Sequence, residues 1–426
     1  MKKKLYADNI THLLDQIVQV WERGGFPFCS EICSSAVAYL AVVLFSRFRV
    51  PVLLVTGTTI EAESMAHEID EWISAEMGNE LASEGSSALV FPSWDIVPGE
   101  RQLPDSETVG RRLATLLSLG RGHVPSNVKD QLRNEAQPKV RFICTPVSAL
   151  VQKTYSLSAL VRRSKMIRVG DELDPVGFSD WAVAYGYEAV GKVTQRGEIA
   201  RKGGVLDIWP LSSAQPIRIE FFGNIIESIR AFDSLTQLST EKLGSIWVPP
   251  AGELAFIREC AQEAEKKDES DCAVSFIENL PAGTVVLFVE PHLLKERLDE
   301  YGRDIPARDI AHFSPETLFS RLRVRSHRVG FVSELPGHLG VDGLRSWIKS
   351  EANLEIGVIR FGIESLETYR PIRSGGVLPE VEAAQRREFF HQLARWQRQG
   401  YTVRVFCSSE VEARRFEELW DEYIPL

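Results

Sequence analysis

The chain has 426 residues, enough for several domains with real hydrophobic cores, and its 44% hydrophobic and 25% charged residues are typical of a folded protein rather than a disordered one. Its formal net charge of −10 disfavours a protein whose main task is to grip nucleic acid by its phosphates, because such proteins are usually basic overall or in one block. The six cysteines form no Cys-x-x-Cys pair, so they indicate reduced core thiols, and no metal is expected.

Residues 1–150 alternate between helical and strand-like patterns. Helical periodicity covers residues 9–21 and 34–45. Short apolar runs of the kind that form buried parallel strands occupy residues 50–55, 88–91 and 140–144. This alternation predicts an α/β doubly wound layer.

Neither the apolar runs nor the N-terminal residues indicate a membrane protein. The longest apolar run, residues 36–45, is too short to span a bilayer. The initial Met-Lys-Lys-Lys is not followed by the apolar segment of a signal peptide. We therefore expect a cytoplasmic protein without a membrane partner.

The pattern changes between residues 155 and 245, where glycine turns and polar–apolar alternation predict a small β-rich α+β domain. A very apolar strand at residues 284–292 then resumes the α/β pattern, so the simplest topology inserts the small domain into the larger one. The expected domains are residues 1–152 plus 246–305 for the larger domain, 153–245 for the inserted domain and 313–426 for a smaller additional α/β domain.

The block from residue 313 to residue 426 has its own alternation. Predicted elements are a helix near 315–322, strands at 328–334 and 354–361, a helix at 379–399 and a strand at 401–409 followed by a helix. In the basic run 321–328, three alternating arginines are predicted to line one exposed strand face rather than to contact nucleic acid: Arg321, Arg323 and Arg325.

The stretch Thr-Gly-Thr-Thr at residues 56–59 follows an apolar run and precedes a helical pattern, which is the layout of a phosphate-binding loop. It lacks the lysine and the second glycine of a P-loop, so a plain strand-to-helix turn is the better interpretation. A catalytic NTPase also needs an acid after an apolar strand to hold magnesium. In Val-Val-Leu-Phe-Val-Glu-Pro-His the first acid position is Val289, followed by Glu290 and His292.

A long ordered pattern at residues 201–237, RKGGVLDIWP…IRIEFFGNIIESIRAFDSLTQ, resembles a segment shared by two bacterial repair families. They are UvrB, the B subunit of the nucleotide-excision nuclease, and Mfd, the transcription-repair coupling factor. The flanking stretches 89–119 and 143–152 are similar to their counterparts in the same module. The resemblance covers residues 1–300, and residues 313–426 resemble more weakly the additional domain that follows in Mfd.

The resemblance implies a degenerate RecA-like domain of the P-loop NTPase type with an inserted β-rich domain. The P-loop position is then residues 28–40, where Glu31, Ser34 and Ser35 stand in place of the glycines and lysine of an active member. Glu290 and His292 fall where an active member has Asp-Glu-Ser-His. These five residues therefore mark an inactive nucleotide site, and no catalytic residue or cofactor is expected.

Two departures favour Mfd over UvrB. The stretch at residues 94–108 is too short for the DNA-clamping hairpin of UvrB and contains no tyrosine, and both nucleotide motifs have decayed. The resemblance implies that the RNA-polymerase-binding and DNA-translocating modules of Mfd would follow residue 426 and are absent from this chain. RNA polymerase and DNA are thus expected as partners only through those modules.

In both families the inserted domain is similar to a docking platform for UvrA, the damage-sensing subunit. Arg218 and Glu220 alternate with two isoleucines on one predicted strand, which gives a core face and a recognition face. The resemblance adds Lys202 on the neighbouring strand, with Arg201 and Arg196 close by; Ala200 replaces a second arginine of UvrB. Without the resemblance, a solvated sheet face is the simpler interpretation. Phe221 and Phe222 are assigned to core and edge packing.

The sequence therefore predicts a non-catalytic adaptor that recruits UvrA to stalled RNA polymerase for nucleotide-excision repair. The alternative is a UvrB-like DNA-dependent ATPase or helicase-type enzyme with an unusual nucleotide site. A third possibility is a nonfunctional remnant or a fragment cut at a domain boundary.

Overall fold

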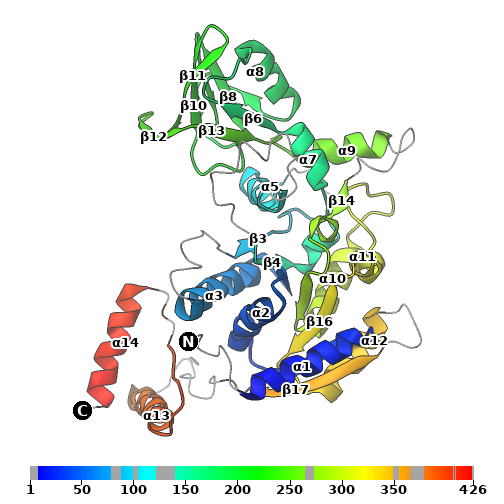
Figure 1. Cartoon of the computed structure of the whole chain (residues 1–426), viewed down its shortest axis with the longest axis vertical. Coiled ribbons are helices and arrows are strands. Elements are labelled where there is room, and N and C mark those ends of the chain that lie inside the picture. Colours follow the sequence, from blue (N-terminus) through cyan, green and yellow to red (C-terminus); the bar gives the residue numbers. More distant parts are fainter. Residues whose placement is uncertain are drawn as a thin grey trace. The chain divides into compact units, whose positions relative to one another are not determined.

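The larger sheet has seven strands in the order β17-β1-β16-β15-β2-β4-β3 (Figure 1). The neighbouring pairs from β1 to β3 in this order are all parallel. The strands are β1 (Phe26–Ile32), β2 (Val52–Thr56), β3 (Leu89–Val90), β4 (Phe142–Pro146), β15 (Val285–Val289), β16 (Arg328–Ser333) and β17 (Ile356–Ile363). The predicted parallel layer is confirmed.

The structure is a computed structural model that describes residues 8–77, 88–98, 104–120, 140–263, 273–348, 355–363, 365, 379–405, 407 and 409–424. It divides into two units, Met1–Phe361 and Gly362–Leu426. β16 and β17 come from the block that was expected to form a separate domain from residue 313, yet they lie in the seven-stranded sheet.

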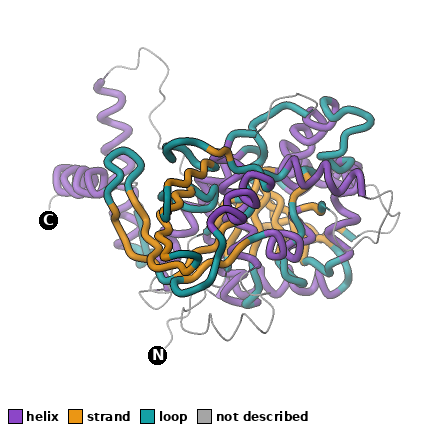
Figure 2. The backbone as a smooth tube through the Cα atoms, turned by 90° about the horizontal axis from the view of Figure 1, so that it is seen from above, coloured by secondary structure: helices purple, strands orange, loops and turns teal. Residues whose placement is uncertain are grey.

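Helices cover both faces of this sheet because its strands are apolar on both sides (Figure 2). Leu53 and Val55 of β2 pack into one core and Leu54 packs into the other. One core includes side chains of α1 (Asp8–Glu22), α2 (Ser34–Phe48) and α3 (Thr59–Met77). The other includes α5 (Ser106–Gly120), α7 (Leu157–Arg163), α9 (Leu254–Glu263), α10 (Pro291–Arg303), α11 (Leu318–Val324) and α12 (Gly337–Ile348).

Short elements complete this part of the fold. β5 (Lys153–Thr154) pairs with β14 (Val274–Ser275) in an antiparallel ribbon. Three single 3₁₀ turns are η2 (Val147–Leu150), η4 (Phe276–Asn279) and η5 (Pro315–Thr317). The basic run starts inside helix α11, which directly follows η5, so the prediction that Arg321 and Arg323 lie on a strand is wrong. Arg321 pairs with Glu278 and stacks over Phe313 instead.

The small domain lies between β4 and β15 in the chain and has a sheet of its own, in the order β12-β11-β10-β9-β8-β7. Its strands are β7 (Glu188–Ala189), β8 (Glu198–Lys202), β9 (Val205–Ile208), β10 (Ile217–Phe222), β11 (Ile225–Phe232) and β12 (Ser239–Leu243). β6 (Lys165–Arg168) pairs with β13 (Ser245–Val248), and α8 (Pro175–Ala184) packs on the core side of the sheet. The structure thus has a second sheet, separate from the parallel one, in the segment for which β-rich structure was predicted.

The second unit contains α13 (Pro379–Arg398) and α14 (Glu410–Tyr423), which agree with the predicted helices. Phe390 of α13 packs against Phe416, Trp420 and Tyr423 of α14, with ring centroids 5.2–6.2 Å apart. The predicted strand at residues 401–409 is not formed at residues 401–405; residues 406 and 408 lie outside the described part.

Candidate functional site

The register of the small sheet decides which side chains share a face. Arg218 lies opposite Asp207 on β9 and Arg230 on β11, and Glu220 lies opposite Ser228. Directly opposed residues point to the same side of a sheet. This side, opposite the core that packs on α8, is called the outer face here; it carries Lys202, Asp207, Arg218, Glu220, Phe222, Ile225, Ser228 and Arg230.

Arg218 is held by two parallel hydrogen bonds. Its Nε donates to Oδ1 of Asp207 at 2.8 Å and its Nη2 donates to Oδ2 at 2.8 Å. These hydrogen bonds raise the pKa of the Arg218 guanidinium, and the guanidinium stacks 4.6 Å from the centre of the Phe232 ring. Such a bidentate pair fixes the direction of the guanidinium as well as its charge.

Glu220 is also engaged within the sheet. Its Oε2 accepts a hydrogen bond from Ser228 Oγ at 2.6 Å and one from Arg230 Nη2 at 3.1 Å. Both Glu220 and Arg230 are about one-third exposed, at 31% and 33%. A partner on the outer face would therefore meet preorganised ion pairs rather than mobile charges.

The three remaining predicted docking residues do not all join this face. Lys202 lies opposite Val205 on the outer face and is exposed. Arg201 lies opposite Leu206, whose side chain is buried in the core, so Arg201 points to the other face. Arg196 lies in the turn before β8 and is half-buried.

Two adjacent phenylalanines lie on opposite sides of β10. Phe221 packs against the small-domain core, whereas Phe222 is 81% exposed and lies opposite Ile225, which is 45% exposed. The assignment of Phe222 to packing is therefore wrong. The strand alternation from Ile217 and Ile219 contained the signal, because it places Phe221 inward and Phe222 outward.

The other end of the outer face meets the loop between β11 and β12. Arg218 Nη1 donates to the carbonyl oxygen of Gln237 at 3.5 Å. Asp233 stabilises this loop by accepting hydrogen bonds from the backbone N–H groups of Leu235 at 3.1 Å and Thr236 at 2.7 Å. Leu235 is 88% exposed, so apolar side chains flank the charged centre of the outer face at both ends.

A buried ion pair fastens both ends of the small domain to the larger sheet. Arg112 of α5 donates from Nε to Glu253 Oε2 at 2.7 Å, and their side chains are 0% and 1% exposed. Glu253 follows the small domain, and Thr154, which precedes it, donates from Oγ1 to Glu253 Oε1 at 2.5 Å. Trp94 Nε1 donates to the same carboxylate at 2.9 Å. Glu253 thus links the two chain segments that enter and leave the small domain to Arg112 and Trp94.

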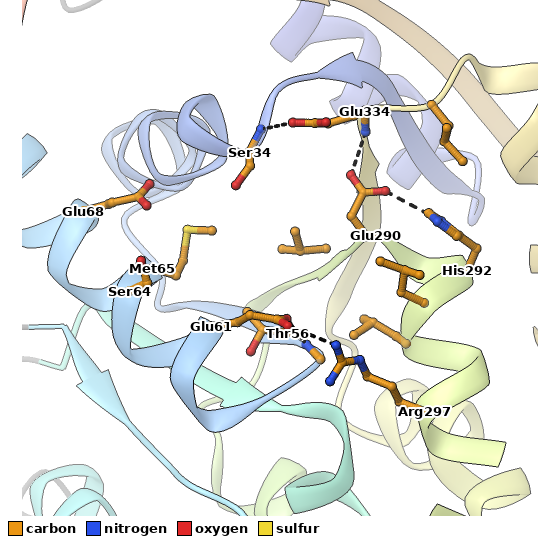
Figure 3. A pocket seen from close by; sticks show the side chains of 15 residues that line it. Ser34, Thr56, Glu61, Ser64, Met65, Glu68, Glu290, His292, Arg297 and Glu334 are labelled. Atoms are coloured by element: carbon orange, nitrogen blue, oxygen red, sulfur yellow. Dashed lines mark hydrogen bonds and ion pairs between the residues drawn. The ribbon is translucent and has the colours of Figure 1, made fainter. Parts of the chain in front are cut away.

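The second candidate site is a cavity of about 450 Å³ at the carboxyl ends of β2, β15 and β16 (Figure 3). This edge is where open parallel sheets bind ligands. Its floor includes the apolar side chains of Met65, Val289, Leu293, Leu294 and Leu335. Its charged lining residues are Glu61, Glu68, Glu290, His292, Arg297 and Glu334.

Two carboxylates connect the helix and strands around this cavity. The backbone N–H of Ser34, at the start of α2, donates to Glu334 Oε1 at 2.7 Å (Figure 3). Glu290 accepts from the backbone N–H of Glu334 at 2.7 Å and from Ser333 Oγ at 2.7 Å. Glu290 also lies 3.6 Å from Nδ1 of His292.

A third carboxylate closes the turn at residues 56–59. Glu61 accepts a hydrogen bond from the backbone N–H of Gly57 at 2.8 Å and lies 3.2 Å from Arg297 Nη2. A Cβ atom at Gly57 would lie 2.7 Å from Arg297 Nε, so the glycine allows this close approach. The predicted plain strand-to-helix turn is confirmed, because β2 ends at Thr56 and α3 begins at Thr59.

Several groups of this cavity that could hold a phosphate already have partners within the chain. A phosphate group needs free backbone N–H groups and a cation. The N–H groups of Ser34 and Gly57 already donate to carboxylates. Among the described residues that line the cavity there is no lysine, and the one arginine, Arg297, pairs with Glu61. Four carboxylates line the same space.

The predicted inactive nucleotide site is only partly assembled. Ser34, Glu290 and His292 line the cavity. Glu31 and Ser35 are not among the lining residues, and Glu31 instead accepts a hydrogen bond from Arg360 Nε at 2.6 Å. Sequence reasoning missed Glu334 and Glu61, because nothing local indicates that their carboxylates reach backbone N–H groups.

In the described residues, none of the helices is long and apolar enough to cross a membrane. Within the same residues, no group of three or more histidine, cysteine, aspartate or glutamate side chains is arranged to hold a metal ion.

Residues 166–254, which include the six-stranded sheet, match the family model of the UvrB interaction domain. The chain is also similar to part of several transcription-repair-coupling factors. It is 27% identical to that of Bacillus subtilis over 275 residues, covering 64% of this chain and 21% of the relative. It is 32% identical to that of Haemophilus influenzae over 175 residues, which are 41% of this chain and 14% of the relative. For Escherichia coli the identity is 26% over 223 residues, 52% of this chain and 17% of the relative. The matched region thus spans less than a quarter of each of these proteins.

Proposed function

We propose that this chain is a non-catalytic adaptor region of a transcription-repair coupling factor that recruits UvrA for nucleotide-excision repair. The observation that carries the proposal is the outer face of the small sheet, which lies within the region matched by the UvrB interaction domain. In an intact coupling factor, UvrA bound there would be delivered to RNA polymerase stalled on damaged DNA. RNA polymerase and DNA would be contacted by other parts of that protein.

The outer face has the properties of a protein-binding surface. Its centre holds rigid ion pairs, which favour specificity and orientation. Its ends carry exposed apolar side chains, of which Phe222 is an aromatic residue of the kind enriched among binding hot spots. Lys202 adds an exposed positive charge on the same face, across β9 from Glu220. We therefore place Lys202, Arg218, Glu220 and Phe222 in the UvrA-docking surface, with Arg196 at its margin.

A titration of purified UvrA with this chain tests the proposal directly. Saturable binding to the wild-type chain is expected, and Arg218→Glu should abolish it because the substitution reverses the charge and leaves Asp207 beside a second carboxylate. Circular dichroism must show that the variant is folded. The absence of wild-type binding would contradict the proposal.

We also propose that the seven-stranded sheet is a RecA-like layer that has lost its nucleotide chemistry. β16 lies between β1, which leads to the proposed P-loop position, and β15, which leads to the acid position. The alternative, a DNA-dependent ATPase, is disfavoured by the carboxylates that occupy the backbone N–H groups of the cavity. Incubation with ATP, with and without DNA, separates the two: phosphate release above the buffer blank would favour the enzyme.

A further inference from the structure

A row of charged side chains crosses the outer face of the small sheet. Arg230 of β11 lies opposite Arg218 of β10 on one side and opposite Lys242 of β12 on the other. Asp207 of β9 ends the row beside Arg218. Directly opposed residues share a face, so Lys242 belongs to the outer face as well, and like charges in such positions are unfavourable. The row therefore holds three neighbouring cations and a single acid.

Arg218 uses its charge within the chain. Besides the two hydrogen bonds to Asp207, its Nη1 and Nη2 donate to the carbonyl oxygen and to Oε1 of Gln237, at 3.5 Å and 3.4 Å. Most of the N–H groups of the guanidinium are thus taken, and the side chain is 24% exposed. Arg218 holds the loop after β11 in place and has little left to offer a partner.

Arg230 and Lys242 are less engaged. Among the described residues, Arg230 makes one side-chain hydrogen bond, from Nη2 to Glu220 Oε2 at 3.1 Å, and its Nε lacks an acceptor. Lys242 is exposed on β12, the last strand of the sheet, and its ammonium group pairs with no acid in the part of the chain that the structure describes. Glu220 is thus the one acid that pairs with these two opposed cations in the described chain.

We propose that Arg230 and Lys242 bind a carboxylate-bearing segment of UvrA, so that the docking surface extends across β11 to β12. This inference rests on the proposed function and adds the chemistry of the partner. A carboxylate between the guanidinium and the ammonium group relieves the repulsion of the opposed cations and accepts charge-assisted hydrogen bonds from both. The pair is continuous with the outer face that carries Lys202 and Glu220, which supports the same occupant.

The test is a titration of purified UvrA with the full chain and two charge-reversal variants. Lys242→Glu should weaken binding by about tenfold, because it places an acid against the acidic segment of the partner. The variant should fold like the wild-type chain, since Lys242 has no partner in the described residues to lose. Arg201→Glu changes the net charge equally on the other face of the sheet and should bind like the wild-type chain.

The salt dependence of binding gives a second readout, which a purely structural effect would not change. Arg230→Gln keeps a side-chain N–H group for Glu220 but removes the positive charge. It should bind more weakly than the wild-type chain and lose less affinity between about 50 mM and about 300 mM sodium chloride. Arg230→Lys retains the charge and should keep the salt dependence of the wild-type chain.

Failure of this inference and failure of the proposed function give different results. If the wild-type chain binds no UvrA, both fail. If it binds UvrA and Lys242→Glu binds equally well, only the present inference is overturned. The same holds if Lys242→Glu and Arg201→Glu lose affinity equally, or if Arg230→Gln keeps the wild-type salt dependence.

Discussion

Phe221 and Phe222 show how one position along a strand changes the role of a side chain. Phe221 completes the small-domain core, and Phe222 stands 81% exposed beside Ile225. An exposed aromatic ring leaves apolar surface in contact with water until a partner covers it, whereas a core ring is already buried. The two residues should therefore respond differently to the same substitution.

We predict that Phe222→Ser weakens UvrA binding by at least tenfold, about 1.4 kcal/mol, without lowering the free energy of unfolding. Phe221→Ser should instead destabilise the small domain, because it removes apolar surface from the core. Binding titration and denaturant unfolding of both variants check this. Equal loss of stability in the two variants would argue against an exposed docking role for Phe222.

His312 is a single residue that should make the free energy of unfolding depend on pH. Burial lowers its pKa from the ordinary 6.5, although the hydrogen bond with Asp309 opposes this. The ring also meets Tyr301, whose hydroxyl lies 2.9 Å from Nε2. A lowered histidine pKa means that the neutral ring is favoured in the folded state, so its contribution to stability is present above pH 6.5 and is lost as the pH falls through the folded pKa.

Accordingly, the free energy of unfolding should fall between about pH 7 and about pH 5.5, a range set by the ordinary histidine pKa. His312→Asn should be less stable at neutral pH and should show a smaller fall. His327, whose pKa burial also lowers, contributes with the same sign and should leave a residual slope. An unchanged slope in His312→Asn, measured by urea unfolding at each pH, would show that His312 is not responsible.

Among the elements, α5 has two adjacent arginines in opposite surroundings. Arg112 is fully buried and donates hydrogen bonds to the side chains of Glu253 and Gln152 and to the carbonyl oxygen of Pro92. Arg111 lies at the surface with Glu63. On the same helix, Gly110 lies so close to the small domain that an added Cβ would be 2.3 Å from the carbonyl oxygen of Leu211. α5 therefore contacts the small domain closely and helps to fix its position against the helix.

Arg112→Ala should cost about 3–5 kcal/mol of unfolding free energy, because it leaves the Glu253 carboxylate buried without its cation. Arg111→Ala should cost about 0–1 kcal/mol, as expected for an exposed pair. Denaturant unfolding of the two variants measures the difference. Similar losses would mean that the buried pair does not anchor the domain.

Sequence patterns predicted the elements better than their assembly. Apolar runs identified the strands β2, β3, β4 and β15, and alternation identified the two faces of β10. They did not predict that β16 and β17 join the seven-stranded sheet, since the choice of neighbouring strand depends on tertiary contacts. The bond from Ser34 to Glu334 is equally hidden, because 300 residues separate its partners. The arginine run at residue 321 misled because its first residues belong to helix α11, which ends at Val324, and strand β16 begins only at Arg328.

In the whole molecule, the proposed docking surface lies on the small domain, and the cavity lined by Glu61, Glu68, Glu290 and Glu334 lies at the edge of the larger sheet. The first is proposed to hold UvrA and the second to be closed to nucleotides. Only the docking surface requires a protein partner, so a binding measurement with UvrA tests its role directly.

The most direct measurement compares the affinity of UvrA for the wild-type chain, Lys202→Glu and Arg201→Glu. The two residues are adjacent and both exposed, but only Lys202 lies on the outer face. We predict at least tenfold weaker binding for Lys202→Glu, about 1.4 kcal/mol, and near wild-type binding for Arg201→Glu. Unchanged binding in Lys202→Glu, or an equal loss in both variants, would contradict docking on the outer face.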